Sequence, residues 1–285
     1  MKFTRLPDIS CALAECPTWD GARNALLWAD IPAGVIHELS LTGGARRSWQ
    51  LPGKVGSFGL AADQTLVVAC ARDIILLDRA SGATRHLASV EPDLPENRFN
   101  DGKVGPDGAF WVGTMDEGPD RRPVGTLYRI DPAGDVQVML SGLRTSNGLA
   151  WSPDGGVLYH ADSRGVWIDQ WDFDARTGRI GNRRRFAEPS EEIGRPDGAA
   201  MDEQGGYWSA GISAGCLNRF ASNGDLQDHL KLPCRAPTMP CFAGADMKTL
   251  YVTSLARDDE TGGIYVARAA VAGSAIPRFG RIAAS

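Results

Sequence analysis

Six polar residues occupy one repeating position of the sequence, where together they could bind a metal ion. Each lies four residues before the apolar residue that ends a short β-rich run. In chain order they are Glu15, Ser57, Asn100, Asn147, Asp197 and Thr238. Carboxylate and amide oxygens are the donors that hard divalent cations prefer. None of the four histidines falls on this position, which argues against a His-rich zinc site.

A structural role for these residues is the alternative to a metal site. A lone Asp-Gly or Asn-Gly is usually only a turn, and a buried Glu is usually hydrogen-bonded or paired. Polar residues in register across a repeat could also form a structural plug with ordered water. Carboxylates gathered closely need a cation, a proton or hydrogen-bond donors. A metal held by three or four protein groups would keep coordination places for water and substrate, as catalysis requires.

Two charged residues accompany the third copy of this position. Arg98 lies two residues before Asn100, so both side chains fall on the same side of an extended segment. Arg98 could hold a substrate oxygen or offset the acids, and a rim salt bridge is the alternative. Glu117 begins a loop after the second strand of the same copy. It could reach the mouth of a site, and a solvated loop acid is the alternative.

The elements that would bring these residues together recur six times. Each copy has a short buried strand, a turn with an aspartate, and a second β-rich run. The turn aspartates recur about every 45 residues, which is the period of a four-stranded propeller blade. They are Asp20, Asp63, Asp107, Asp154, Asp202 and Asp246. We therefore predict an all-β fold, a six-bladed β-propeller with four-stranded blades around a central channel. A single domain would span 1–285, and the starts of the innermost strands would ring the channel mouth.

The chain ends and four polar inserts complete this prediction. Segments 2–6 and 277–282 are the candidates for strands that close the ring within one blade. Longer inserts fall at 90–97, 116–123, 188–194 and 257–262. We expect these inserts to be surface loops, some of which rim the channel.

Composition argues against several classes of function. The formal net charge is −5 and no basic block is present, which argues against nucleic-acid and membrane partners. No apolar run is long enough to span a membrane, and the first residues lack a signal-peptide core, so we expect a cytoplasmic protein. The six scattered cysteines are expected to be buried thiols. No Ser-His-Asp or Cys-His arrangement is visible, so we expect no acyl-enzyme. The chain would be a monomer or a small homo-oligomer.

Four segments of the chain resemble the gluconolactonase family, which includes regucalcin, and the match covers nearly the whole sequence. They are AECPTW at 14–19, NRFNDGK at 97–103, SNG at 146–148 before SPDG at 152–155, and PDG at 196–198. Together these segments are specific, although each alone would be weak. YHAD at 159–162 and KTLY at 248–251 are similar to bacterial sugar lactonases of this family.

The resemblance implies a six-bladed propeller with one catalytic divalent metal. The family's metal ligands match Glu15, Asn147 and Asp197. Calcium is the expected ion, and zinc, iron(II), magnesium and manganese stay open. The implied reaction is hydrolysis of a sugar-derived lactone, such as gluconolactone, to its aldonic acid. Asp197 is the candidate general base, because a ligand carboxylate can accept a proton from water.

The resemblance also implies the substrate contacts. Asn100 matches a residue beside the metal that contacts substrate or a coordinated water, and Arg98 matches a substrate-contacting arginine. The family's acidic contact either falls on Glu117 or is lost at Gly118. Two other functions stay open. One is a metal-dependent, phosphotriesterase-like hydrolase with the same kind of site, and the other is a non-catalytic calcium-binding propeller.

Overall fold

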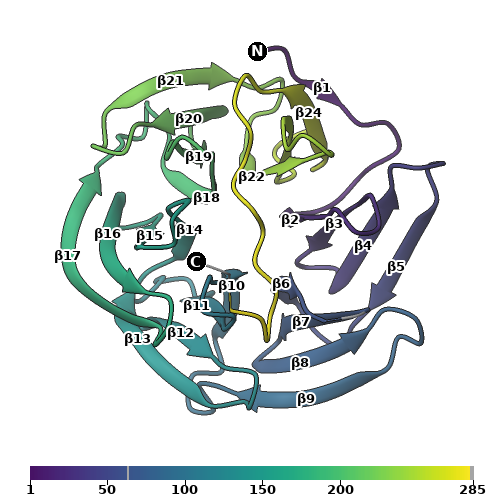
Figure 1. Cartoon of the computed structure of the whole chain (residues 1–285), viewed down its shortest axis with the longest axis vertical. Coiled ribbons are helices and arrows are strands. Elements are labelled where there is room, and N and C mark those ends of the chain that lie inside the picture. The colour runs from purple at the N-terminus through teal and green to yellow at the C-terminus, as the bar shows by residue number, and fades with distance from the viewer. Residues whose placement is uncertain (63, 283–285) are drawn as a thin grey trace.

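Six four-stranded antiparallel sheets form a ring around a central channel in a computed structural model of the protein, which describes residues 1–62 and 64–282 (Figure 1). The predicted six-bladed β-propeller is therefore confirmed. The turn aspartate at position 63 lies outside the described residues. The described part of the chain contains strands and loops only, and it therefore has no helix that could cross a membrane.

The first three blades are built from consecutive strands that follow one another from the channel outward. Blade 1 contains β2 (Ala14–Asp20), β3 (Ala25–Asp30), β4 (Val35–Ser40) and β5 (Arg46–Gln50). Blade 2 contains β6 (Val55–Leu60), β7 (Thr65–Cys70), β8 (Asp73–Asp78) and β9 (Thr84–Ser89). Blade 3 contains β10 (Asn97–Val104), β11 (Phe110–Asp116), β12 (Gly125–Ile130) and β13 (Val136–Leu143).

The next two blades repeat this order, and the sixth differs from it. Blade 4 contains β14 (Ser146–Trp151), β15 (Val157–Asp162), β16 (Trp167–Asp174) and β17 (Arg179–Ala187). Blade 5 contains β18 (Pro196–Met201), β19 (Tyr207–Gly211), β20 (Cys216–Phe220) and β21 (Leu226–Lys231). Blade 6 contains β22 (Pro237–Ala243), β23 (Thr249–Ser254) and β24 (Ile264–Arg268), and its outer strand is β1 (Thr4–Arg5).

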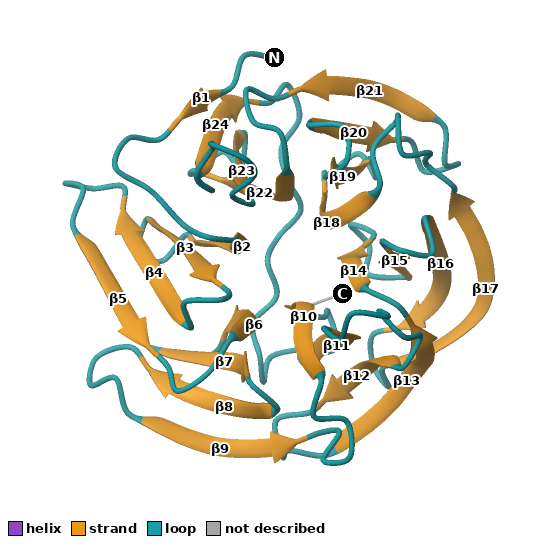
Figure 2. Ribbon diagram, turned by 180° about the vertical axis from the view of Figure 1, so that it is seen from behind, coloured by secondary structure: helices purple, strands orange, loops and turns teal. Residues whose placement is uncertain are grey.

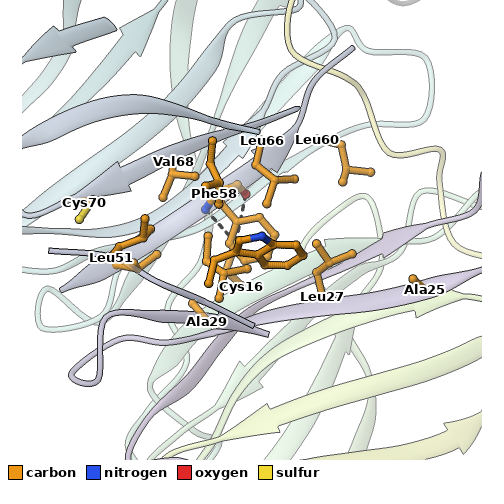
Figure 3. Packing of buried hydrophobic residues seen from close by; sticks show 14 residues of the cluster. Cys16, Ala25, Leu27, Ala29, Leu51, Phe58, Leu60, Leu66, Val68 and Cys70 are labelled. Atoms are coloured by element: carbon orange, nitrogen blue, oxygen red, sulfur yellow. Dashed lines mark hydrogen bonds between the residues drawn. The ribbon is translucent and has the colours of Figure 1, made fainter. Parts of the chain in front are cut away.

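The hydrophobic core is divided into six clusters, each between two neighbouring blades. Figure 3 shows the cluster between blades 1 and 2, where Cys16 meets Phe58. The Cys16 thiol donates a hydrogen bond to the Phe58 carbonyl at 3.2 Å and accepts one from the Phe58 amide at 3.3 Å. All six cysteines are free and buried, so the prediction of buried thiols is confirmed. Each blade packs against a neighbouring blade on both faces. Its inner strands, such as β3 in blade 1 and β14 in blade 4, are therefore buried along their whole length.

The N-terminal segment, one of the two candidates, closes the ring. Thr4 pairs with Val266 and Arg5 with Tyr265 at the outer edge of blade 6. The prediction that 277–282 would also form a closing strand is wrong, because β1 already occupies that edge. Residues 272–282, which we call the C-terminal strap, instead run across the middle of the ring (Figure 1).

The C-terminal strap bonds to turns of several blades at one end of the channel. Its Ser274 amide donates to the Met201 carbonyl at 2.9 Å, and its Phe279 amide donates to the Leu60 carbonyl at 2.7 Å. A cavity of about 500 Å³ lies between the strap and the ends of the innermost strands. The starts of those strands, and the predicted site, face the opposite end (Figure 2).

Candidate active site and metal centre

The six positions of the predicted ring lie at or near the starts of the six innermost strands, and all six side chains are buried. In every one of these strands the pairing with the second strand shifts register at or beside this position. Such β-bulges turn the strand locally and can re-aim a side chain. The residue after the ring position has a left-handed φ in blade 1 (Cys16, 51°) and in blade 4 (Gly148, 66°). The repeat thus places the polar groups, and the bulges reorient the strand around them.

Three buried carboxylates, those of Glu15, Asp101 and Asp197, share this end of the channel. Burial raises the pKa of Asp197 to about 8, and the charge of Asp101 adds to the effect. Burial, together with Asp197 and Asp101, also raises the pKa of Glu15 well above its ordinary value. These charges act on one another because the acids lie close together in a site from which water is largely excluded. The fold therefore brings Glu15 and Asp197 together although they are far apart in the sequence.

Asn147 is fixed by hydrogen bonds on both sides of its amide. Its Nδ2 donates to Ser163 Oγ at 2.7 Å, and its Oδ1 accepts from Asn100 Nδ2 at 3.1 Å. Ser163 Oγ in turn donates at 2.5 Å to the carbonyl of Pro196, the residue before Asp197. This chain of hydrogen bonds connects blades 3, 4 and 5 and fixes the direction in which the Asn147 amide oxygen points.

Arg98, Asn100 and Glu117 form a second polar group beside the acids. Arg98 Nη1 donates to Asn100 Oδ1 at 2.7 Å, and Arg98 Nε donates to Glu117 Oε1 at 2.7 Å. Lys54 Nζ holds the other oxygen of Glu117 at 2.6 Å. Burial acts to raise the pKa of Glu117, but the bonds from Lys54 and Arg98 keep it below its ordinary value. The rim salt bridge considered for Arg98 is present, and the same guanidinium contacts the Asn100 amide.

The donor set fits a divalent cation. In the part of the chain that the structure describes, no set of three or more His, Cys, Asp and Glu side chains alone could hold an ion. An ion here would therefore need the Asn147 amide oxygen in addition to the Glu15 and Asp197 carboxylates. All three groups present oxygen atoms, and hard cations prefer oxygen. Oδ1 of Asp101 is buried and has no hydrogen-bond partner among the described residues, and a cation nearby would stabilise it.

Three residues of this region were not predicted from the sequence. Asp101 belongs to an Asn-Asp-Gly run that looks like a turn, yet it lies inside β10, at the register shift before Gly102. Lys54 is a single lysine in a connection, and nothing in its surroundings signals that it binds Glu117. Ser163 follows β15, the second strand of blade 4. It accepts a hydrogen bond from Asn147, which lies on the neighbouring strand β14.

Two of the six ring positions belong to the packing between blades. Thr238 Oγ1 donates to the Ala14 carbonyl at 2.6 Å, which connects blade 6 to blade 1. Ser57 Oγ is buried without a hydrogen-bond partner among the described residues. The predicted metal and substrate residues occupy the remaining four positions, Arg98 on strand β10, and Glu117 on the loop after β11. Their roles stay predictions.

Comparison with known proteins identifies the family. The profile of the SMP-30/gluconolactonase/LRE-like region matches residues 13–256. The chain is 39% identical over 279 residues to 6-deoxy-6-sulfogluconolactonase of Pseudomonas putida, with 94% of each chain covered. It is 33% identical over 274 residues to regucalcin of Oryctolagus cuniculus, with 91% of each covered.

A solved structure agrees with this assignment. The crystal structure of a calcium-binding protein, regucalcin from Agrobacterium tumefaciens, superimposes with a TM-score of 0.91 at 29% identity and covers 96% of each chain. The family profile spans blades 1 to 5 and the two inner strands of blade 6, and it includes all the predicted site residues. The chain therefore belongs to the SMP-30/gluconolactonase/LRE-like family.

Proposed function

We propose that this protein hydrolyses a sugar-derived lactone to the corresponding aldonic acid, with one divalent cation held by Glu15, Asn147 and Asp197. The main support is the pair of buried carboxylates at one channel end, both with a raised pKa, beside an oriented amide oxygen. Family membership adds to it, because the family description includes gluconolactonase and one relative is named as a sulfogluconolactonase.

The chain's own groups have distinct tasks in this proposal. A bound cation would supply positive charge that polarises the ester carbonyl. Asp197 would accept the proton of the attacking water, because a carboxylate that holds the cation can also act as a general base toward a neighbouring water. Glu15 and Asn147 hold the cation. The hydrogen bond to Ser163 prevents the Asn147 amide from rotating so that its nitrogen and oxygen exchange places.

Arg98, Asn100 and Glu117 would bind the hydroxyl groups of the sugar ring. Arg98 and Glu117 are already bonded to each other, so the guanidinium donor and the carboxylate acceptor are in position before the substrate binds. Lys54 fixes the outer oxygen of Glu117. The ion pairs with Arg98 and Lys54 hold the Glu117 carboxylate in place, so that it can accept a hydrogen bond from a substrate hydroxyl group.

Calcium is the ion we propose first. The three groups offer oxygen atoms only, and calcium accepts such ligands with flexible geometry. The regucalcin crystal structure is described as that of a calcium-binding protein. Zinc, iron(II), magnesium and manganese are the other ions to test in metal reconstitution.

The test compares lactonase activity before and after chelation. Treatment with EDTA should abolish aldonolactone hydrolysis, and added metal should restore it. Asp197→Asn should lower kcat by about 10²- to 10⁴-fold, because it removes the proton acceptor and one ligand charge. Asp228→Asn is the matched control, because Asp228 is exposed on the outer strand β21.

Each other outcome has a defined meaning. Activity that survives both EDTA and Asp197→Asn would refute the proposed mechanism. Metal binding without turnover of any aldonolactone would favour a non-catalytic calcium-binding propeller. Faster hydrolysis of a phosphotriester than of every lactone would favour the phosphotriesterase-like alternative.

A further inference from the structure

Four arginines gather at the site end of the channel, on loops of blades 3, 4 and 5. Arg121 lies in the connection between β11 and β12, and Arg164 in the connection between β15 and β16. Arg144 precedes β14, and Arg195 precedes β18. We call these four residues the rim arginines. All four connections lie at the channel end where the innermost strands β14 and β18 begin. These two strands carry Asn147 and Asp197.

Three of the rim arginines have no ion-pair partner in the part of the chain that the structure describes. Arg195 pairs with Glu191 at 3.4 Å. Within the described residues, Arg121, Arg144 and Arg164 form no ion pair. Other basic residues of this end do find acids: Arg122 pairs with Asp116 at 3.1 Å, and Arg98 with Glu117 at 2.7 Å.

The rim arginines lie close enough to repel one another. Arg144 Nη1 donates to the Arg121 carbonyl at 3.4 Å. Partial burial and the charges of Arg121, Arg195 and Arg144 lower the pKa of Arg164. Like charges held together in this way oppose folding unless something of opposite charge offsets them.

Asp162, the acid whose charge acts on Arg164, is occupied by backbone groups. Its two oxygens accept the amide hydrogens of Arg144 at 2.8 Å and Thr145 at 3.0 Å, and also those of Arg164 and Gly165. Asp162 therefore holds the two loops together and offers little to the guanidinium groups. It fixes the positions from which Arg144 and Arg164 extend their side chains.

The rim arginines adjoin the reaction centre. Arg164 directly follows Ser163, whose hydroxyl accepts from the Asn147 amide. Arg195 lies two residues before Asp197 and acts to lower its pKa. A small molecule whose ester lies beside Asp197 would therefore extend toward the rim arginines with its other end.

We propose that the rim arginines bind an anionic group on the substrate, so that the substrate is a sugar lactone carrying a sulfonate, a phosphate or a carboxylate at the end of the molecule away from the ester. This inference rests on the proposed lactonase function. Guanidinium groups bind oxyanions through paired charge-assisted hydrogen bonds, and binding neutral hydroxyl groups does not require several arginines.

The experiment compares matched lactones on the metal-loaded full-length protein. The substrates are gluconolactone and the same lactone with a sulfonate, a phosphate or a carboxylate at carbon 6. We expect kcat/KM to be at least about tenfold higher for one anionic lactone than for the neutral one. Arg164→Gln should reduce that preference about tenfold through KM, and should leave kcat/KM for gluconolactone within about twofold.

Arg235→Gln is the matched control, because Arg235 lies at the same channel end but is paired with Asp258 at 2.5 Å. This variant should keep the anionic preference. High salt should weaken the preference of the unchanged protein, since it screens exposed charges. Equal kcat/KM for neutral and anionic lactones, with Arg164→Gln affecting both alike, would overturn the inference and leave the lactonase proposal standing.

A binding measurement separates this inference from the lactonase proposal. If no lactone is hydrolysed, the proposed function fails. Calorimetric titration with glucose and with its 6-sulfonate then tests the rim arginines by themselves. Tighter binding of the sulfonate that is lost in Arg164→Gln supports the anion site, and equal binding of both sugars overturns it.

Discussion

At the scale of single residues, Asp101 has opposite effects on metal binding and on stability. Its buried carboxylate adds negative charge next to Glu15 and Asp197, and one of its oxygens has no hydrogen-bond partner among the described residues. We expect Asp101→Asn to weaken metal binding about tenfold and to stabilise the metal-free protein by about 1 kcal/mol. Calorimetric metal titration and urea unfolding in EDTA measure the two effects. Weaker metal binding together with lower metal-free stability would show that Asp101 is mainly a structural residue.

His160 makes stability depend on pH. It is fully buried, its Nε2 meets Ser146 Oγ at 2.8 Å, and burial with the charge of Arg183 lowers its pKa from 6.5 to about 3. Between these values the unfolded chain binds a proton that the folded chain does not, so stability falls as the pH falls. The group should contribute a loss of about 2 kcal/mol between pH 7 and pH 5.

The His160 prediction is checked by urea unfolding at both pH values. His160→Gln should be less stable at pH 7 but should lose less stability on acidification. His86→Gln is the control, because His86 is exposed on β9. An unchanged difference between pH 7 and pH 5 in His160→Gln would assign the acid sensitivity to other groups.

At the scale of the blade, the turn aspartates do more than mark the repeat. Asp202 is buried and accepts bonds from Trp208 Nε1 at 2.8 Å and from Arg219 Nε at 2.7 Å. It therefore fastens the second and third strands of blade 5 to their turn. Asp202→Ala should lower the free energy of unfolding by about 3 kcal/mol, because it leaves buried donors and a partly buried charge unpaired.

Asp154 provides the comparison for that prediction. It lies in the corresponding turn of blade 4, two positions further along the turn than Asp202 in blade 5, and it is exposed. Among the described residues its side chain bonds to Ser152 and Gly156. Asp154→Ala should therefore cost less than about 1 kcal/mol in urea unfolding. Similar losses for both variants would mean that the turn itself, and not the contact with the arginine, sets the contribution.

The repeat made the blades and the ring of polar positions predictable from the sequence. Every blade needs the same strands and turns, so the period and the starts of the inner strands recur in the residue pattern. The bulges at Glu15 and Asn147 were not predictable, because they depend on how a strand meets the channel. For the same reason Asp101 was not singled out from the sequence. The rim arginines carry no repeat signal, since they lie on loops of different length.

At the scale of the whole molecule, the two ends of the channel are built differently. The site end is made of loops that carry charged groups. The other end is covered by the C-terminal strap, whose residues 277–282 were a candidate for a closing strand. Phe279 of the strap is buried in the cluster between blades 2 and 3, and Arg278 pairs with Asp20 of blade 1 at 2.9 Å. Because Ser274 also bonds to blade 5, the strap connects blades that are not neighbours in the ring.

This separation predicts that the strap affects stability without affecting catalysis. Phe279→Ala should lower the free energy of unfolding by about 3 kcal/mol, because it leaves a cavity in the core between blades 2 and 3. Its kcat/KM at 25 °C should stay within about twofold of the unchanged protein, since Glu15, Asn147 and Asp197 lie at the other end. Urea unfolding and lactone hydrolysis on the same preparations measure both quantities. A large fall in kcat/KM of folded Phe279→Ala would mean that packing at the strap is transmitted along the innermost strands to the acids.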